Sequence, residues 1–278
     1  MSNKVLMKGN EAIAEAAIKA GCRHYFGYPI TPQTEIAAYM AKRMPKIGGT
    51  FLQAESEVSA INMVYGVAGA GFRVMTSSSS PGISLKQEGI SYIAGADLPA
   101  LIVNVQRGGP GLGGIQPSQS DYFQATKGGG HGDYRLIALA PASVQEMADF
   151  VGLAFDLAFK YRNPAILLAD GVIGQMMEKV VLPEQRNRLT DEEVIARCPW
   201  ATNGKTAGRK PNIITSLELD PSEMEKRNIH LQAKYAEIEA NEVRYEEINC
   251  EDAEYLIVAF GSCARIAQKT MELARAEG

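Results

Sequence analysis

The sequence predicts an α/β fold of the doubly wound type, in which helices cover both faces of a parallel sheet. Strand candidates at 100–106 and 165–170 are almost entirely apolar, as expected for parallel strands that are buried on both faces. Helical patterns alternate with strand patterns throughout residues 10–170, which is typical of βα units wound around one sheet. Residues 1–171 are therefore predicted to form one large domain.

The first part of this domain is expected to contain two helices and two strands. A helix over 10–20 follows the N-terminus directly, and strands are expected at 24–28 and 50–53. Between these strands, Thr31 is predicted to cap a second helix with Pro32 as its first residue, because proline fits the first helical position well.

The remaining elements of the domain continue the alternation. Apolar residues recur at helical spacing over 58–68, and a further strand is predicted at 73–77. Because the strands of such a sheet are parallel, their carboxyl ends meet at one edge, and ligands of open α/β sheets bind there.

Residues 172–252 differ from the domain before them. They are polar, contain four prolines and are predicted to form a long linker. Apolar side chains within it fall near one face of a helix, at Met224, Leu231, Tyr235, Ile238 and Tyr245. This face is expected to pack on the chain's own domain, with a partner helix as the alternative.

A second α/β unit is predicted to start within residues 253–278. The apolar stretch 255–260 is expected to be a strand and 264–274 a helix. One strand and one helix cannot bury a core of their own. The unit is therefore expected either to be a truncated part of a longer polypeptide or to dock on the first domain.

Composition and charge exclude several classes of protein. The 28 basic and 32 acidic residues give a formal net charge of −4, so no global basic field favours nucleic acid or an anionic membrane. No apolar run reaches the roughly 18 residues that span a bilayer, and no apolar signal core follows Met1. A cytoplasmic protein with no membrane partner is expected.

The four cysteines and three histidines do not form a metal-binding pattern. No CxxC pair occurs, so the usual signatures of iron–sulfur and structural zinc sites are missing. No HExxH occurs either. The chain is therefore expected to hold no metal ion and no iron–sulfur cluster of its own.

Three segments leave predicted strands at the carboxyl edge with side chains suited to an anionic substrate. They are 28–32 with Thr31, 53–57 with Glu57, and 105–111 with Arg107. A hydroxyl, a carboxylate and a guanidinium together supply a base and a clamp for a carboxylate. Each also has a simpler role open to it: Thr31 as a helix cap, Glu57 as a first-turn acid, and Arg107 as a solvated side chain. Glu55 competes with Glu57 for any acid role.

These segments resemble the α subunit of the 2-oxoacid:ferredoxin oxidoreductases. The run Tyr-Pro-Ile-Thr-Pro at 28–32 is similar to a motif of that family. Similarity continues in the family's order at Ser56-Glu57, 76–81, 105–110, 127–133, 142–146 and 258–264. Such an ordered set is far more specific than any single motif. Overall similarity, including 113–121, is greatest to subunits that act on branched-chain 2-oxoacids such as 3-methyl-2-oxobutanoate.

The resemblance implies a division of the chain and a role for each candidate residue. The first domain would be the pyrimidine-binding domain of a thiamine-diphosphate enzyme, and 253–278 would be the start of a transketolase C-terminal-like domain. Glu57 would face N1′ of the aminopyrimidine and share a proton with it, while Thr31 and Arg107 would contact the substrate. The implied cofactor-binding residues are Tyr28, Pro29, Ile30 and Glu57.

The resemblance also implies that the chain works with partners. The half of such enzymes that binds diphosphate and Mg²⁺ carries a Gly-Asp-Gly segment, whereas Ala169 precedes Asp170 and Gly171 here. A β subunit would therefore hold the diphosphate and Mg²⁺, and a ferredoxin-like iron–sulfur subunit would pass electrons to ferredoxin. The implied reaction is the oxidative decarboxylation of a 2-oxoacid to an acyl-coenzyme A by a hetero-oligomer.

Three alternatives stay open. Residues 109–114 spell GxGxxG, the fingerprint of a dinucleotide-binding turn, but Arg107 and Gly108 separate it from the strand and Pro117 lies where a helix would form. The chain could also be a non-catalytic assembly subunit. Within the family, 2-oxoglutarate or pyruvate could be the substrate.

Overall fold

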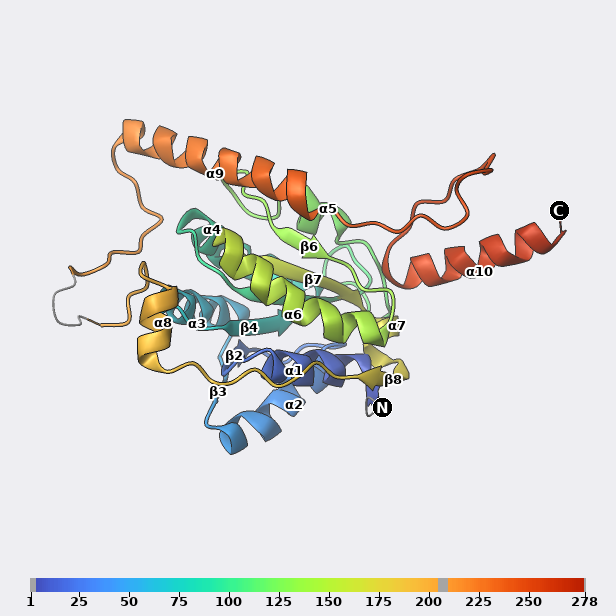
Figure 1. Ribbon diagram of the computed structural model, residues 1–278, viewed down its shortest axis with the longest axis horizontal. Coiled ribbons are helices and arrows are strands. Elements are labelled where there is room, and N and C mark those ends of the chain that lie inside the picture. The colour runs from blue at the N-terminus through green and yellow to red at the C-terminus, as the bar shows by residue number, and fades with distance from the viewer. Residues whose placement is uncertain (1–3, 205–209, 278) are drawn as a thin grey trace.

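The protein is built around a six-stranded sheet in which every strand is parallel to its neighbours (Figure 1). The computed structural model describes residues 4–204 and 210–277. The strands are β2 (His24–Gly27), β3 (Thr50–Gln53), β4 (Val74–Ser78), β5 (Leu101–Gln106), β6 (Ile137–Leu139) and β7 (Ala165–Asp170). Their spatial order is β3-β2-β4-β5-β7-β6. The predicted parallel sheet is confirmed, and the short β6 is an addition to the predicted strands.

Helices cover both faces of this sheet, so the doubly wound class is also confirmed. One face is buried by α1 (Gly9–Lys19), α2 (Thr34–Arg43) and α6 (Val144–Tyr161), and the other by α3 (Glu57–Gly69) and α4 (Ser80–Gly95). Side chains of the central β5 alternate between the two cores, with Leu101, Val103 and Val105 on the first face and Ile102 on the second. This double burial explains the mostly apolar pattern of the strand. No helix in the described part of the chain is both long and apolar enough to cross a membrane.

The winding of the sheet reverses between β2 and β4. β3 lies on one side of β2, whereas β4 and all later strands of this sheet lie on the other. In open α/β sheets, ligands bind outside the carboxyl ends of the strands that flank such a reversal. The segments that follow β2, β3, β4 and β5 therefore surround the expected site.

The second helix begins later than predicted. α2 starts at Thr34 and Gln33 precedes it, so Thr31 is not a helix cap and Pro32 is not a helical residue. The stretch before Gln33 is a loop instead, and its Thr31–Pro32 peptide is cis. The prediction was wrong because the buried Gln33 side chain donates from Nε2 to Tyr28 O (3.2 Å) and holds this loop through a contact that helix propensity does not reveal.

A strand precedes the first helix, which was expected to follow the N-terminus directly. β1 (Lys4–Lys8) pairs antiparallel with β8 (Met177–Val181) in a separate two-stranded sheet. Both strands are short and mixed in polarity, and their pairing joins segments from opposite ends of the domain. Local pattern carries little information about such a pairing. Through it, the beginning of the predicted linker is part of the folded body.

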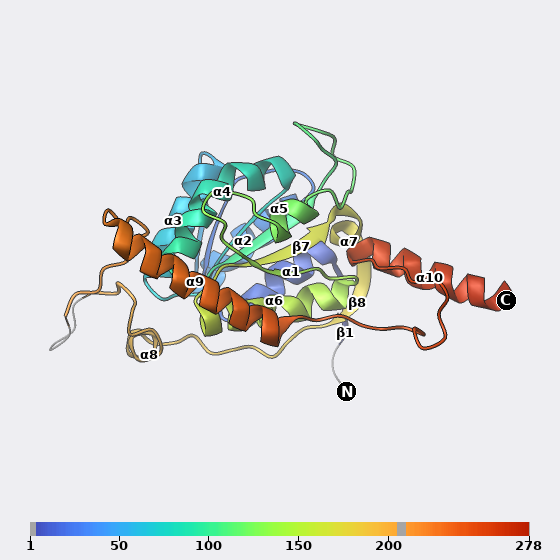
Figure 2. The same cartoon turned by 90° about the horizontal axis from the view of Figure 1, so that it is seen from above.

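Residues 182–204 and 210–252 run along the outside of the domain (Figures 1 and 2). They contain α8 (Asp191–Arg197) and the long α9 (Pro221–Glu242). Of the predicted apolar face, Leu231 and Tyr235 are buried, whereas Met224 and Tyr245 are exposed. The helix therefore packs on its own domain, as expected, through the middle of that face.

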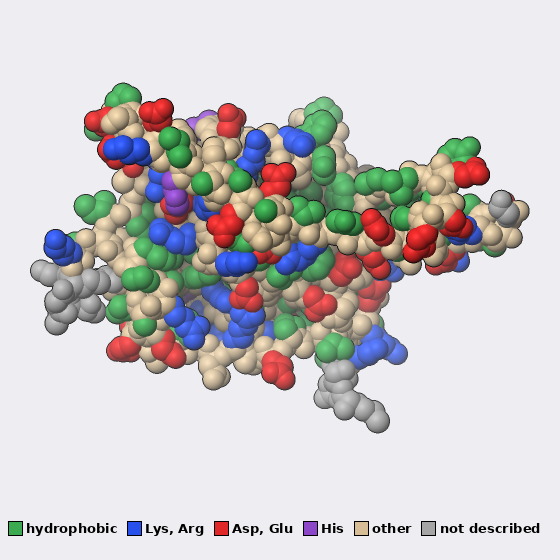
Figure 3. All heavy atoms as spheres, turned by 45° about the horizontal axis from the view of Figure 1, so that its top comes forward, with side chains coloured by type: hydrophobic (Ala, Val, Ile, Leu, Met, Phe, Trp, Pro, Cys, Tyr) green, Lys and Arg blue, Asp and Glu red, His purple; other side chains and the backbone are tan. Residues whose placement is uncertain are grey.

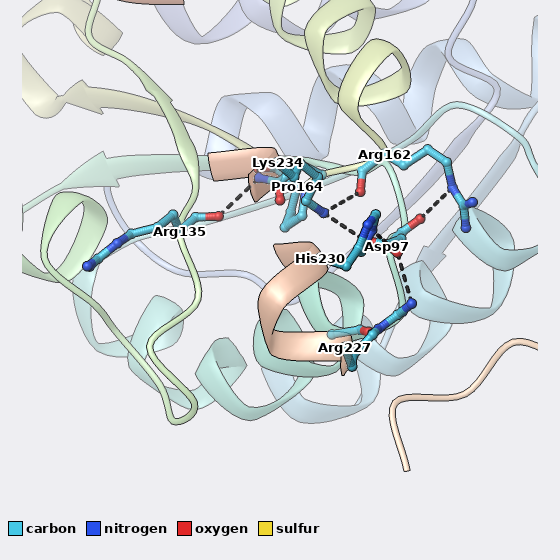
Figure 4. A network of polar contacts seen from close by, with 9 residues as sticks. Asp97, Arg135, Arg162, Pro164, Arg227, His230 and Lys234 are labelled. Atoms are coloured by element: carbon cyan, nitrogen blue, oxygen red, sulfur yellow. Dashed lines mark hydrogen bonds and ion pairs between the residues drawn. The ribbon is translucent and has the colours of Figure 1, made fainter. Parts of the chain in front are cut away.

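A cluster of charged side chains fixes α9 to the domain (Figure 4). Asp97 is buried just after α4 and accepts from Lys234 Nζ (2.7 Å), while Arg227 Nη1 and His230 Nε2 each lie 3.0 Å from its Oδ2. Arg162 donates from Nε to Asp97 O (3.0 Å) and accepts from Lys234 through its carbonyl (3.1 Å). Burial alone raises the pKa of Asp97, but the neighbouring Lys234, Arg227 and His230 outweigh it and hold the pKa below its usual range. Charge as well as apolar contact thus holds α9 in place.

Residues 255–260 are not a strand, contrary to the prediction. In the described part of the chain no strand lies beside them, and an unpaired strand leaves its backbone N–H and C=O groups without partners. α10 (Gly261–Glu277) follows, close to the predicted helix, and projects from the body in two perpendicular views (Figures 1 and 2). Its base is held where Gln119 Nε2 donates to Phe260 O (2.7 Å). Residues 255–277 together form a C-terminal arm. The apolar side chains exposed along this arm (Figure 3) include Tyr255, Leu256, Ile257 and Val258.

Candidate active site

The loop after β2 carries the predicted site residues Tyr28, Pro29, Ile30 and Thr31. A buried series of hydrogen bonds fixes it. Tyr25 of β2 donates from its hydroxyl to Ser77 Oγ of β4 (2.6 Å), and Ser77 donates to Gln33 Oε1 (2.5 Å). Gln33 Nε2 then donates to Tyr28 O. Burial raises the pKa of Tyr25 well above its usual value, so its hydroxyl stays a donor. The loop is thus anchored where the winding of the sheet reverses.

Arg107 follows β5 and bridges two loops. It is 7% exposed, and it donates from Nη1 to Thr31 O (3.1 Å) and from Nη2 to Leu112 O (2.9 Å). Its Nε is buried and has no hydrogen-bond partner in the described part of the chain. Arg107 is therefore not a solvated side chain. It meets Thr31 through the backbone carbonyl, and the Thr31 residue itself is exposed.

Ser80, at the start of α4, fixes the backbone of Arg107. Its Oγ accepts from Arg107 N (3.0 Å) and donates to Asp121 Oδ2 (2.6 Å), which also accepts from Asn104 Nδ2 (2.9 Å). Ser80 has a φ of 20°, which is uncommon for a residue other than glycine and is typical of functional sites. Sequence reasoning missed this network. The signal that reveals it is Asn104, a polar residue in the middle of a mostly apolar buried strand.

Glu57 is the first residue of α3 and is 5% exposed. The helix is capped by Ser56, whose Oγ accepts from Ser59 N (3.2 Å). The competing acid Glu55 is exposed and accepts from Ser59 Oγ (3.0 Å). Among the described residues, no hydrogen bond or ion pair ends on the Glu57 carboxylate. Burial and an uncommitted carboxylate therefore distinguish Glu57 from Glu55.

Gly82 of α4 lies against the Glu57 side chain. A Cβ on Gly82 would be 2.7 Å from Glu57 Oε1 and 2.1 Å from Ser78 Oγ, so no larger residue fits. Further along α4, a Cβ on Gly89 would be 2.4 Å from Ile61 Cγ2 of α3. The two glycines allow α3 and α4 to pack closely, with Glu57 held between them.

The structure thus places the three candidate side chains on segments at one edge of the sheet but joins only two of them. Arg107 contacts Thr31, whereas Glu57 faces α4, and no polar contact between described residues links it to the other two. Two hollows in the described surface lie elsewhere. One of about 620 Å³ is beside Met224 on α9, and one of about 300 Å³ is beside Trp200.

Comparison with known proteins decides the family. The family described as pyruvate flavodoxin/ferredoxin oxidoreductase, thiamine diphosphate-binding, matches residues 15–247. The chain belongs to this family. It is 55% identical over 276 residues to the ketoisovalerate oxidoreductase subunit VorB of Methanothermobacter thermautotrophicus, a match that covers 98% of this chain and 76% of that protein. It is 39% identical over 292 residues to the 2-oxoglutarate synthase subunit KorA of Methanocaldococcus jannaschii, covering 98% of this chain and 79% of that protein.

A solved structure supports the same assignment. The 2-oxoglutarate:ferredoxin oxidoreductase from Magnetococcus marinus, with 2-oxoglutarate, coenzyme A and succinyl-CoA bound, matches with a TM-score of 0.78 and 30% identity. The match covers all of this chain and 52% of that chain.

These matches confirm the expected family and reaction type. The chain is a subunit of a ferredoxin-dependent 2-oxoacid oxidoreductase, it has a thiamine diphosphate-binding domain, and it works in a hetero-oligomer. The reading as a non-catalytic assembly subunit is not favoured. The dinucleotide-binding reading of 109–114 also fails, because that stretch is a loop and the next helix, α5, begins only at Tyr122.

The residues of this oxidoreductase subunit fit the pyrimidine half of thiamine diphosphate. A group that shares a proton with a ring nitrogen needs a carboxylate that is shielded from water and free of other partners, and Glu57 meets both conditions. Nearby at the carboxyl end of β4, the buried hydroxyls of Ser78 and Ser79 also have no hydrogen-bond partner among the described residues. Uncommitted polar groups thus gather at this end of the sheet.

The Asp170-Gly171 segment begins a short helix in the structure. Asp170 Oδ1 is occupied as the cap of α7 (Gly171–Gln175), where it accepts from Val172 N (2.8 Å) and Ile173 N (3.1 Å). Within 4–204 and 210–277, no group of three His, Cys, Asp or Glu residues could hold a metal ion.

Proposed function

We propose that this subunit supplies the catalytic acid and the substrate clamp for oxidative decarboxylation of a branched-chain 2-oxoacid, such as 3-methyl-2-oxobutanoate, to an acyl-coenzyme A. Glu57 is the acid, and Thr31 and Arg107 bind the substrate carboxylate. The residues that line the cofactor with Glu57 are Tyr28, Pro29 and Ile30. The observation that carries the proposal is the buried Glu57 carboxylate, which has no partner among the described residues of a thiamine diphosphate-binding domain.

The role of Glu57 is to hold a proton that it shares with the aminopyrimidine. When bound, thiamine diphosphate supplies the reactive carbon and the electron sink for loss of carbon dioxide. Burial of Glu57 keeps water from competing for the shared proton. The missing side chain at Gly82 leaves the space that the carboxylate occupies.

The role of Arg107 and Thr31 is to hold the substrate carboxylate. A guanidinium has five N–H donors, and two of those of Arg107 are used by the carbonyls of Thr31 and Leu112. These two bonds fix the plane of the guanidinium, and the remaining donors suit a planar carboxylate. The exposed Thr31 adds a hydroxyl beside them.

The other half of the site belongs, in this proposal, to partner chains. A β subunit holds the diphosphate and Mg²⁺, a ferredoxin-like subunit carries iron–sulfur clusters, and ferredoxin accepts the electrons. The occupied Asp170 carboxylate and the lack of any CxxC pair in the sequence support this division. Coenzyme A as the acyl acceptor is supported by its presence in the Magnetococcus marinus enzyme.

The proposed division of the chain follows the same logic. Residues 1–171 form the pyrimidine-binding domain, 172–252 a linker whose first strand, β8, pairs with that domain, and 253–278 the start of a second domain. The apolar side chains exposed along 255–258 support the last assignment, because further parts of such a domain would cover them.

The preference for a branched-chain substrate rests on degree of similarity. Identity is 55% to a ketoisovalerate oxidoreductase subunit and 39% to a 2-oxoglutarate synthase subunit over nearly the same length. 2-Oxoglutarate is the alternative that the second relative favours.

Reconstitution tests the proposal. The chain is expressed with and without its partner subunits, and bound thiamine diphosphate is measured. We expect cofactor in the complex and almost none in the isolated chain. The complex is then compared on 3-methyl-2-oxobutanoate, 2-oxoglutarate and pyruvate with a viologen acceptor. Equal rates would remove the substrate preference, and a complex that binds no cofactor would contradict the proposal itself.

A further inference from the structure

Lys86 is a fully buried lysine on the face of α4 that packs against α3. It lies one helical turn after Gly82, which contacts Glu57, and three residues before Gly89, which contacts Ile61. Residues at these spacings share one face of a helix. Glu57 and Ile61 are themselves one turn apart on α3. Lys86 therefore lies in the α3–α4 interface, between the positions of Glu57 and Ile61 along α3. Its side chain is 0% exposed.

The ammonium of Lys86 has no hydrogen-bond partner in the described part of the chain. Burial lowers the pKa of Lys86 to about 8, and Glu57 is the neighbouring charge that opposes this by favouring the ammonium. Lys86 is thus mostly charged at neutral pH. A buried cation without a direct partner is costly unless an opposite charge nearby compensates it.

We propose that Lys86 is a positioning residue that sets the proton affinity of Glu57. A buried positive charge favours the carboxylate over the carboxylic acid. With Lys86 charged, the proton that Glu57 shares with the aminopyrimidine is therefore held more by the ring nitrogen and less by the carboxylate. The inference rests on the proposed function of Glu57 and deepens it.

The arrangement makes the acid sensitive to pH through its neighbour. As pH rises through about 8, Lys86 loses its proton and Glu57 loses the compensating charge. The buried carboxylate then has no neighbouring positive charge from Lys86. A neutral residue at position 86 should leave Glu57 without this neighbouring charge at every pH.

Cofactor binding in the assembled complex gives the first test. The variants are Lys86→Met, an unbranched side chain that is one atom shorter, and Lys86→Gln, a second neutral replacement in case one variant folds poorly. Lys42→Met is the control, because Lys42 is exposed on α2. Thiamine diphosphate affinity is measured by calorimetry between pH 6 and 9.5. We expect the pH at which affinity falls to half to rise by about one unit in both Lys86 variants. We expect no change in Lys42→Met.

The dependence on Glu57 is tested in the same experiment. In a Glu57→Gln background, Lys86→Met should leave the pH profile unchanged, because the group that Lys86 acts on has been removed. A similar shift with and without Glu57 would overturn the proposal. So would the absence of any shift in both Lys86 variants.

Unfolding of the cofactor-free full chain gives an independent readout. The Lys86 pKa is lower in the folded chain than the usual 10.5, so its destabilising effect is fully present below pH 8 and fades as pH rises toward about 10.5. Lys86→Met should therefore stabilise the chain on the low-pH side of this window. It should do so more strongly in the Glu57→Gln background, where the countercharge is missing. If the effects of Lys86→Met and Glu57→Gln on the free energy of unfolding were strictly additive at every pH, the proposed coupling would be overturned.

The two readouts separate the inference from the function on which it rests. If unfolding shows the coupling while Glu57→Gln leaves cofactor binding and its pH profile unchanged, Glu57 does not serve the cofactor. The proposed function then fails, although the charge pair exists. If Glu57→Gln changes the profile but unfolding shows no coupling, the proposed function stands and the role of Lys86 is contradicted.

Discussion

The proposed chemistry depends on a few side chains at the carboxyl edge of the sheet. Their burial distinguishes candidate residues that the sequence alone does not distinguish. Glu55 and Glu57 are two positions apart, yet one is solvated and the other is enclosed beside Gly82. The residue types at this edge were predictable, because parallel strands deliver their following loops to one place. Gln33, Ser80 and Lys86 were not, since each interacts with a residue distant in sequence.

Arg107→Lys tests the substrate clamp. A lysine keeps the charge but loses the planar fork, so we expect kcat/KM for the oxoacid to fall by about 10- to 100-fold, corresponding to roughly 1.5–3 kcal/mol. The loss should come mainly from KM. Steady-state kinetics of the assembled complex measure it. Arg43→Lys, which changes a partly exposed ion pair with Glu15, is the control and should have little effect. Equal kinetics in both variants would argue against a clamp at Arg107.

At the scale of elements, the packing of α3 on α4 and of α9 on the body sets where charges lie. Five of the six strands of the sheet, together with α1 and α3, were predictable from apolar periodicity, to within a few residues at their ends. Other features were not. α2 starts late because Gln33 holds the preceding loop, β1 and β8 pair across the domain, and 255–260 lacks a neighbouring strand. In none of these three cases does the local apolar pattern record the contact that is made or missing.

Gly82→Ala tests the close approach of α3 and α4. The added methyl would overlap Ser78 Oγ and Glu57 Oε1, so the carboxylate must move. We expect a destabilisation of about 1–3 kcal/mol and loss of cofactor binding. Gly66→Ala on α3 is the matched control, because a Cβ there meets nothing within 4 Å. It should stabilise the helix by up to about 1 kcal/mol. Thermal unfolding and cofactor content distinguish the two. Similar behaviour of both variants would rule out a specific role for Gly82.

Asp97→Asn tests the anchoring of α9. The change leaves the buried Lys234 without its countercharge, so we expect a loss of about 3 kcal/mol and faster hydrogen exchange throughout α9. Glu223→Gln, in an exposed pair with Lys226 on the same helix, should cost less than about 0.5 kcal/mol. Because the pKa of Asp97 is depressed, its stabilisation is complete above the unfolded value near 4 and is lost as pH falls below it. Protection factors of the α9 amides, which are corrected for the intrinsic pH dependence of exchange, that stay constant down to pH 3 would contradict this.

For the whole molecule, the fold was predictable because one sheet is buried on both faces. Strands buried in this way are almost entirely apolar, and such stretches are easily recognised in the sequence. The outer parts were less predictable, because they attach through ion pairs and a small two-stranded sheet rather than through a continuous core. The molecule leaves uncommitted polar groups at one end of its sheet and an apolar arm at its C-terminus. Both features fit a chain that works as one subunit among several.

The most direct test of the central claim is turnover of the assembled complex after Glu57→Gln, with Glu55→Gln as the matched control. If Glu57 is the catalytic acid, 2-oxoacid-dependent viologen reduction should fall by about 10²- to 10⁴-fold, while the Glu55 variant stays near wild type and the complex remains assembled. Near-wild-type turnover in Glu57→Gln, or an equal loss in Glu55→Gln, would contradict the assignment.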